Sequence, residues 1–156
     1  MIANIEKLKW YLEQDKWNLR YLFHGSPYEI DILEPRKSTD AQNKENEDNA
    51  IFLTSWFISA VAYAFRNKLK EINEHYAFSM NNSGELPAMS FQVEYIPDDL
   101  YGYVYAFDKT DDTIKDHHEY TTQYRCYYEL RPVDVVKVYY KDFASYFNRE
   151  ISQKSK

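Results

Sequence analysis

A chain of 156 residues, 44% of them hydrophobic, is long enough for one domain with a substantial core. The net charge of −6 and pI of about 5.2 disfavour a nucleic-acid partner, because phosphate binding needs clustered Lys and Arg, and we find no dense basic patch. The only cysteine, Cys126, excludes an intramolecular disulfide and a cysteine metal cluster.

The first twenty residues mix lysines and acids with apolar residues and lack the uncharged core of a signal peptide. No apolar run approaches the length needed to cross a membrane. We therefore expect a cytoplasmic protein with no membrane partner.

A helix and a short strand are the first elements expected. Residues 2–17 carry an apolar stripe with helical period, which predicts an N-terminal helix within residues 1–20. Residues 21–23 are apolar and β-prone, and this strand is expected to stop at the turn cluster Gly25-Ser26-Pro27.

A long polar stretch follows. Arg36 to Asn49 has no apolar period, and we expect a mobile loop over residues 37–49. After it, residues 50–54 are typical of a buried strand, and residues 56–70 of a helix that the Ser55 hydroxyl would cap.

The second half of the chain consists mainly of strands. Alternating or β-prone segments separated by turns predict them at residues 89–95, 101–107, 119–128 and 133–140. Residues 74–88 fit no single element, and residues 143–151 are expected to form a short terminal helix. Because the strands follow one another without regular crossover helices, we expect a single α+β domain over residues 1–156 with a mostly antiparallel sheet.

Two blocks of sequence resemble ADP-ribosyltransferase-like domains, in the His-Tyr-Glu branch that includes PARP and diphtheria toxin. The first block, Leu22-Phe23-His24-Gly25-Ser26, looks like the family's strand with its His-Gly. The second runs without a gap from Ala50 to Tyr63 and looks like the family's next strand and helix. Residues 33–36 also resemble a turn in small bacterial and phage-borne proteins of this type.

The resemblance implies an ADP-ribosyltransferase-like fold, with a mostly antiparallel split β-sheet and flanking helices, and it implies NAD as the substrate. His24 would bond a ribose hydroxyl and belong to the catalytic set. Gly25 would present its backbone to the nicotinamide amide, where a Cβ would obstruct the approach. Tyr63 would stack on the nicotinamide ring, while Ser26 would belong to the same cofactor-binding set.

The remaining implied residues include departures from the family pattern. Arg36 would reach the pyrophosphate, since its planar fork suits that anion. Phe52, a further cofactor-binding position, stands where the family has its triad tyrosine and lacks the hydroxyl, and Ala60 replaces a small serine. For the catalytic carboxylate, which would stabilise positive charge on the ribose, Glu119 is our first choice. The alternatives for that position are Gln123 and Glu129.

Metal binding is not expected at His117-His118-Glu119, because adjacent side chains of a strand point to opposite faces. The sequence thus predicts an NAD-dependent ADP-ribosyltransferase acting on an unknown protein or small-molecule acceptor. One alternative is a catalytically inactive nucleotide- or NAD-binding module. Another is a small acidic inhibitor acting through a protein partner, for which the acidic segment 40–48 is the only support.

Overall fold

The structure, a computed structural model, describes residues 5–14, 20–37, 49–81, 88–108, 114–116 and 123–151, and has an α+β fold. A seven-stranded sheet has the order β7-β8-β3-β1-β6-β9, with β2 beside β3, and a three-stranded sheet has the order β10-β5-β4. The strands of the two sheets are β1 (Tyr21–Ser26), β2 (Arg36–Lys37), β3 (Asn49–Thr54), β4 (Tyr76–Asn81), β5 (Ala88–Val93), β6 (Tyr101–Asp108), β7 (Ile114–Asp116), β8 (Gln123–Cys126), β9 (Asp134–Tyr139) and β10 (Phe147–Ile151).

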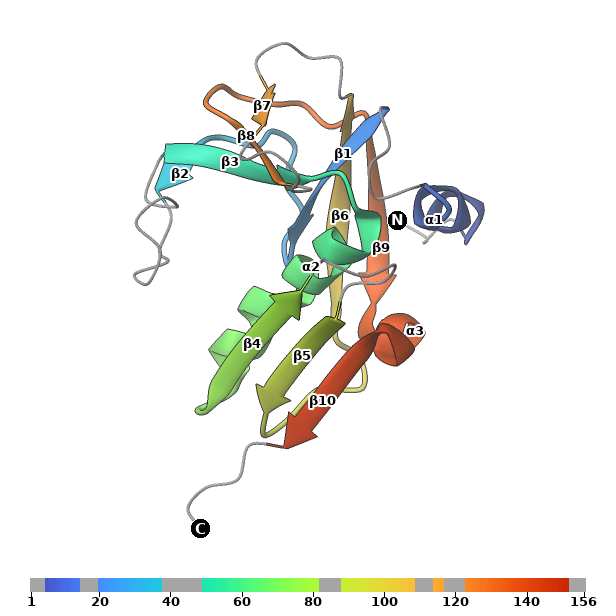
Figure 1. Ribbon diagram of the computed structural model, residues 1–156, viewed down its shortest axis with the longest axis vertical. Coiled ribbons are helices and arrows are strands. Elements are labelled where there is room, and N and C mark those ends of the chain that lie inside the picture. The colour runs from blue at the N-terminus through green and yellow to red at the C-terminus, as the bar shows by residue number, and fades with distance from the viewer. Residues whose placement is uncertain are drawn as a thin grey trace.

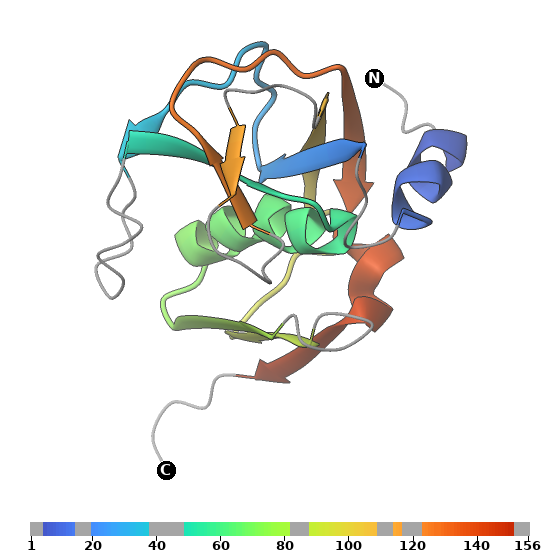
Figure 2. The same ribbon diagram turned by 45° about the horizontal axis from the view of Figure 1, so that its top comes forward.

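The helices are α1 (Ile5–Leu12), α2 (Phe57–Ile72) and α3 (Tyr140–Phe143), and a 3₁₀ turn (Ala144–Tyr146) follows α3. Helix α2 lies between the two sheets, as Figures 1 and 2 show. No helix in the described part of the chain is long and apolar enough to cross a membrane.

Strand β6 is buried on both of its faces, which explains its apolar sequence. Val104 and Ala106 belong to the core cluster that contains α2, whereas Tyr103, Tyr105 and Phe107 belong to a second cluster on the opposite face of the sheet. This separation follows from the alternation of side chains along a strand. The seven-stranded sheet therefore divides the interior into two cores.

Helix α2 approaches the sheet closely at two glycines. A Cβ built on Gly25 would clash with the backbone oxygen of Ala60 and stand 2.6 Å from the nitrogen of Ala64. A Cβ on Gly102 would stand 2.7 Å from the oxygen of Ala64. Small residues on both sides of this contact therefore let the helix backbone lie directly on β1 and β6.

A buried amide joins the C-terminal end of α2 to the end of β5. The Nδ2 of Asn73 donates to the carbonyl oxygens of Leu69 and Tyr95, each at 2.9 Å. Its Oδ1 accepts the backbone N–H groups of Glu94 at 3.0 Å and Tyr95 at 2.8 Å. Because each polar atom of the amide makes two bonds, Asn73 fixes the chain that leaves α2 against the segment that leaves β5.

Most of the strands expected in the second half are confirmed, as are the strand before α2 and α2 itself. The expected end of the first strand was wrong, because β1 continues through Gly25 and Ser26 in register with β6. The expected bounds of the loop over residues 37–49 were wrong, because Lys37 and Asn49 pair with each other between β2 and β3. Residues 38–48, which include the acidic segment, lie outside the described residues.

Two further expectations were wrong. The N-cap of α2 is Trp56 and not Ser55; Trp56 makes no side-chain capping bond, and its own N–H donates to the Thr54 hydroxyl at 3.1 Å. The expected terminal helix over residues 143–151 is α3 and a 3₁₀ turn, followed by the strand β10. Strand β10 pairs in parallel with β5, a partner too distant in sequence for local periodicity to reveal.

The Asn73 clamp generates a stability prediction. Asn73→Ala removes four hydrogen bonds and leaves two backbone N–H groups without their acceptor, so we expect a loss of about 2–4 kcal/mol in the free energy of unfolding. Urea titration followed by circular dichroism measures this. Asn67→Ala, at an exposed position of the same helix, is the matched control and should change stability by no more than about 0.5 kcal/mol. Equal effects of the two substitutions would contradict the clamp.

Candidate functional site

The seven-stranded sheet splits between β1 and β3, and His24 bridges the split. The two strands share the single registered pair Phe23 and Thr54. Past that pair, β1 follows β6 and β3 follows β8. The Nδ1 atom of His24 lies 2.8 Å from the carbonyl oxygen of Phe52, so the imidazole spans the two strands where their ladder ends.

This bond sets the chemical character of the imidazole. A carbonyl oxygen only accepts, so the neutral His24 ring carries its proton on Nδ1 and presents Nε2 as an acceptor. By alternation, the half-buried ring leaves β1 on the face of Leu22, away from the face that α2 covers. The geometry thus holds an acceptor nitrogen at the split, and such a nitrogen suits a hydroxyl group.

The packing of α2 supplies a structural reason for Gly25. Its missing Cβ would point at Ala60 and Ala64, so this position must be glycine whatever the site binds. The family resemblance instead implied that Gly25 is required for the approach of a nicotinamide. The role of the Gly25 backbone toward a ligand stays a prediction.

Tyr63 projects from α2 three residues after Ala60, and side chains at this spacing are neighbours on a helix surface. It is half-buried, and its ring centroid lies 6.1 Å from that of Phe78 in β4. The guanidinium carbon of Arg66 lies 5.7 Å from the Tyr63 ring centroid. The described contacts of Tyr63 are therefore with β4 and its own helix, while those of His24 are with β3.

Ser26 is committed to the turn that follows β1. It is buried, and its hydroxyl accepts the N–H of Tyr28 at 3.2 Å. Tyr105 of β6 secures the same turn, because its hydroxyl donates to the Tyr28 carbonyl at 2.8 Å and accepts the Ile30 N–H at 2.6 Å. Burial raises the pKa of Tyr105 to about 12, so the hydroxyl remains a donor at neutral pH. The segment after His-Gly is thus anchored to the sheet.

Phe52 presents its ring on the face of β3 opposite to Ile51 and Leu53. Arg125 of β8 is its cross-strand partner, and the guanidinium carbon lies 5.9 Å from the ring centroid. The Nη1 of Arg125 also donates to the Tyr127 hydroxyl at 3.2 Å. Sequence reasoning did not assign Arg125 to the site. The signal that was available is its spacing, because the residue two positions after Gln123 shares its face of the strand.

The three candidates for the catalytic position fall in different places. Glu119, our first choice, lies outside the described residues. Gln123 opens β8 opposite Thr54, which pairs in turn with Phe23, so these residues form a row across three strands. Neighbouring strands are about 4.8 Å apart, which puts Gln123 roughly 10 Å from β1 at the closed end of the split. Glu129 is exposed in the segment after β8.

Arg36 lies in β2, where it pairs with Ala50. Ala50 is at the opposite end of β3 from Thr54, so the Arg36 backbone lies at the open end of the split. The side chain of Arg36 is not among those that the structure describes. The structure therefore brings the His24 imidazole, Gly25 and the Phe52 backbone together at the split, with Ser26 in the turn that leaves it, whereas the Phe52 ring lies on the other face of the sheet from the imidazole.

The chain matches no protein-family model, no curated protein and no solved structure. The likeness to ADP-ribosyltransferase-like domains accordingly rests on the motif residues themselves.

The bond between His24 and β3 predicts a single ring tautomer. At a pH where the ring is neutral, long-range ¹H–¹⁵N spectra should show Nδ1 with the shift of a protonated nitrogen and Nε2 with that of an unprotonated one, because Nδ1 donates to Phe52. His24→Ala assigns the signals by their disappearance. A ring protonated on Nε2 would contradict the geometry.

Proposed function

We propose that this chain binds NAD in the split between β1 and β3 and transfers ADP-ribose from it to an acceptor. The supporting observation is the His24 imidazole, which its Nδ1 bond to the Phe52 carbonyl fixes beside the single residue pair that joins β1 and β3. Gly25, the next residue of β1, contacts α2, the helix that carries Tyr63, on the opposite face of the strand.

Each residue at the split has a role in this proposal. The Nε2 of His24 accepts a ribose hydroxyl, and the backbone of Gly25 bonds the carboxamide of the nicotinamide. Tyr63 and Phe52 provide aromatic surface for the flat pyridine ring, because aromatic rings pack well in offset-stacked arrangements. Arg36 reaches the pyrophosphate, as the resemblance implies. Holding the ring and the ribose separately fixes the bond between them for reaction.

The transfer of ADP-ribose requires one charged group of the protein, a carboxylate. When the bond between the ribose C1′ and the nicotinamide nitrogen breaks, the electron pair leaves with the nicotinamide and positive charge develops on the ribose. A carboxylate beside the ribose stabilises that charge. The acceptor then bonds to C1′ and releases its proton. Glu119 is the residue that we propose for this carboxylate.

NAD binding is tested by thermal denaturation and calorimetry. At a concentration of about 100 times its Kd, NAD should stabilise the chain by about 2.7 kcal/mol, a shift of roughly 5–10 °C at this size. His24→Ala should weaken NAD about tenfold, because one ribose hydrogen bond is lost. Asn67→Ala, exposed on α2, should bind as the native chain does. The proposal fails if NAD stabilises neither the native chain nor the Asn67→Ala variant.

A second candidate function is NAD binding without turnover. Gln123 favours it, because this residue at the closed end of the split is an uncharged amide in the row with Thr54 and Phe23. If Gln123 occupied the catalytic position, the developing charge would meet no carboxylate. Phe52, which lacks the hydroxyl of the family's tyrosine, is consistent with the same interpretation.

Two substitutions separate the functions. If the chain is a transferase, Glu119→Gln should reduce nicotinamide release and label transfer from adenylate-labelled NAD to lysate acceptors by about 100-fold or more, with NAD binding retained. If it only binds NAD, the native chain releases no nicotinamide, and Gln123→Glu should introduce measurable release. Equal turnover by the native and Glu119→Gln chains would exclude Glu119 as the catalytic carboxylate.

A further inference from the structure

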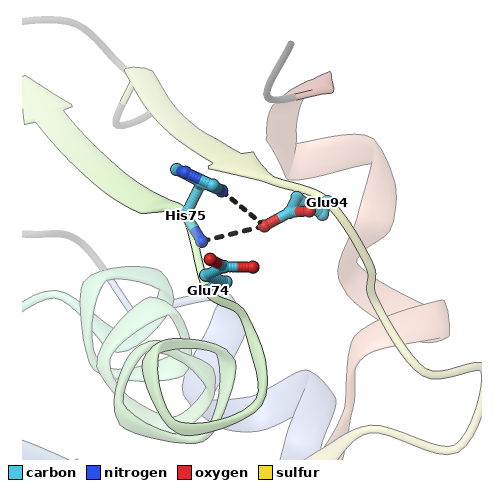
Figure 3. A group of neighbouring side chains, drawn as sticks. All are labelled: Glu74, His75 and Glu94. Atoms are coloured by element: carbon cyan, nitrogen blue, oxygen red, sulfur yellow. Dashed lines mark hydrogen bonds and ion pairs between the residues drawn. The ribbon is translucent and has the colours of Figure 1, made fainter. Parts of the chain in front are cut away.

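A second cluster of reactive side chains lies at the other end of α2. Glu74 and His75 follow the Asn73 clamp, and Glu94 follows β5. One ligand atom from each of the three side chains lies within 4.8 Å of the other two. Figure 3 shows them side by side at the junction of α2, β4 and β5. Sequence reasoning missed the cluster because His75 and Glu94 are 19 positions apart.

We propose that Glu74, His75 and Glu94 bind a divalent transition-metal ion, with Zn²⁺ as the preferred ion. An imidazole and two carboxylates are a donor set that Zn²⁺ accepts, with water completing the coordination. Hard cations such as Mg²⁺ prefer oxygen ligands alone and gain nothing from the imidazole.

The separation of the first two ligand atoms fits one ion. Zinc binds a histidine nitrogen at about 2.0–2.1 Å and a carboxylate oxygen at about 2.0–2.2 Å, which puts the two ligand atoms about 2.8–3.5 Å apart, the lower values at octahedral and the higher at tetrahedral angles. The Nδ1 of His75 lies 2.9 Å from the Oε1 of Glu94. The metal would replace the proton of this hydrogen bond, and the two atoms would have to move apart by a few tenths of an ångström only for a tetrahedral ion.

The third ligand distinguishes this cluster from an ordinary surface ion pair. Glu74 brings a second carboxylate to the same imidazole, and two like charges at one site oppose each other unless a cation lies between them. The His75 side chain is 47% exposed and that of Glu94 28% exposed, so an ion and its waters can enter from solvent. The net charge of −6 also favours the approach of cations.

The backbone that carries the three ligands is already fixed. Asn73 immediately precedes Glu74, and its Oδ1 accepts the backbone N–H of Glu94 at 3.0 Å. The backbone N–H of His75 adds a 2.9 Å bond to the Oε1 of Glu94. Since one buried amide holds both segments, little chain ordering remains to oppose binding, as in sites supported by a hydrogen-bonded second shell.

The metal site is independent of the proposed NAD site. Helix α2 has 16 residues and is therefore about 24 Å long, and the split lies at its N-terminal end while the cluster follows its C-terminal end. A bound ion here would connect the start of β4 to the end of β5, which makes it a structural clip.

The test is calorimetric titration of the full chain, stripped with a chelator, with zinc chloride and with magnesium chloride. We expect one Zn²⁺ per chain and no comparable binding of Mg²⁺. Glu74→Gln keeps the bond between His75 and Glu94 intact, so it tests the site without disturbing the fold, and it should weaken zinc at least about tenfold. His75→Ala should weaken zinc at least as much, and Co²⁺ should give the absorption bands of a nitrogen-ligated ion that this variant loses.

The matched control removes two histidines that do not belong to the cluster, the sequence neighbours His117 and His118. The double variant His117→Ala/His118→Ala should bind zinc as the native chain does. Loss of zinc binding in that control, native affinity in both Glu74→Gln and His75→Ala, or no saturable binding by the native chain would each overturn the proposal. None of these results depends on whether the chain binds NAD.

Discussion

The close contact between α2 and the sheet determines the rest of this structure. Ala60 and Ala64 lie directly on Gly25 and Gly102, so the helix backbone is nearer to β1 and β6 than ordinary side chains would permit. A methyl group added at either glycine would meet backbone atoms, which cannot rotate away as a flexible side chain can. The depth at which α2 lies therefore follows from four small residues.

That depth also sets what the two ends of α2 can do. At the N-terminal end, the helix follows Thr54, the one residue of β3 that pairs with β1, so the closed end of the split lies where α2 begins. At the C-terminal end, Asn73 connects the helix to the segment that leaves β5. One rigid helix thus positions both the candidate NAD site and the candidate metal site, each built from residues that the chain places next to a helix end.

The local sequence pattern was sufficient to predict most of the helices and strands, but it was insufficient to predict which strands pair with each other. Residues 50–54, 101–107 and 133–140 were predicted as strands because a buried strand leaves a short apolar or alternating signal. Strand β10 was missed, because it exists by virtue of parallel pairing with β5 and its own sequence also suits a helix. The N-cap position was wrong by one residue: the helix begins at Phe57 and its N-cap is Trp56, whose N–H the Thr54 hydroxyl accepts.

The candidate site was predictable in its residue types and not in its contacts. The resemblance singled out His24, Gly25 and Phe52, but the bond from the imidazole to the backbone of β3 depends on where two strands separate, which no local pattern encodes. It also gave Gly25 a ligand-binding reason, whereas packing against α2 alone requires the glycine. The proposed chemistry therefore depends on the residues that packing does not explain. In the proposed site, the imidazole nitrogen and the aromatic rings would bind the nicotinamide and its ribose without a carboxylate, whereas cleavage of the glycosidic bond needs a carboxylate beside the ribose. The proposed binding and the proposed catalysis are thus separable, and they differ by one acidic side chain at the start of β8 or just before it in the sequence.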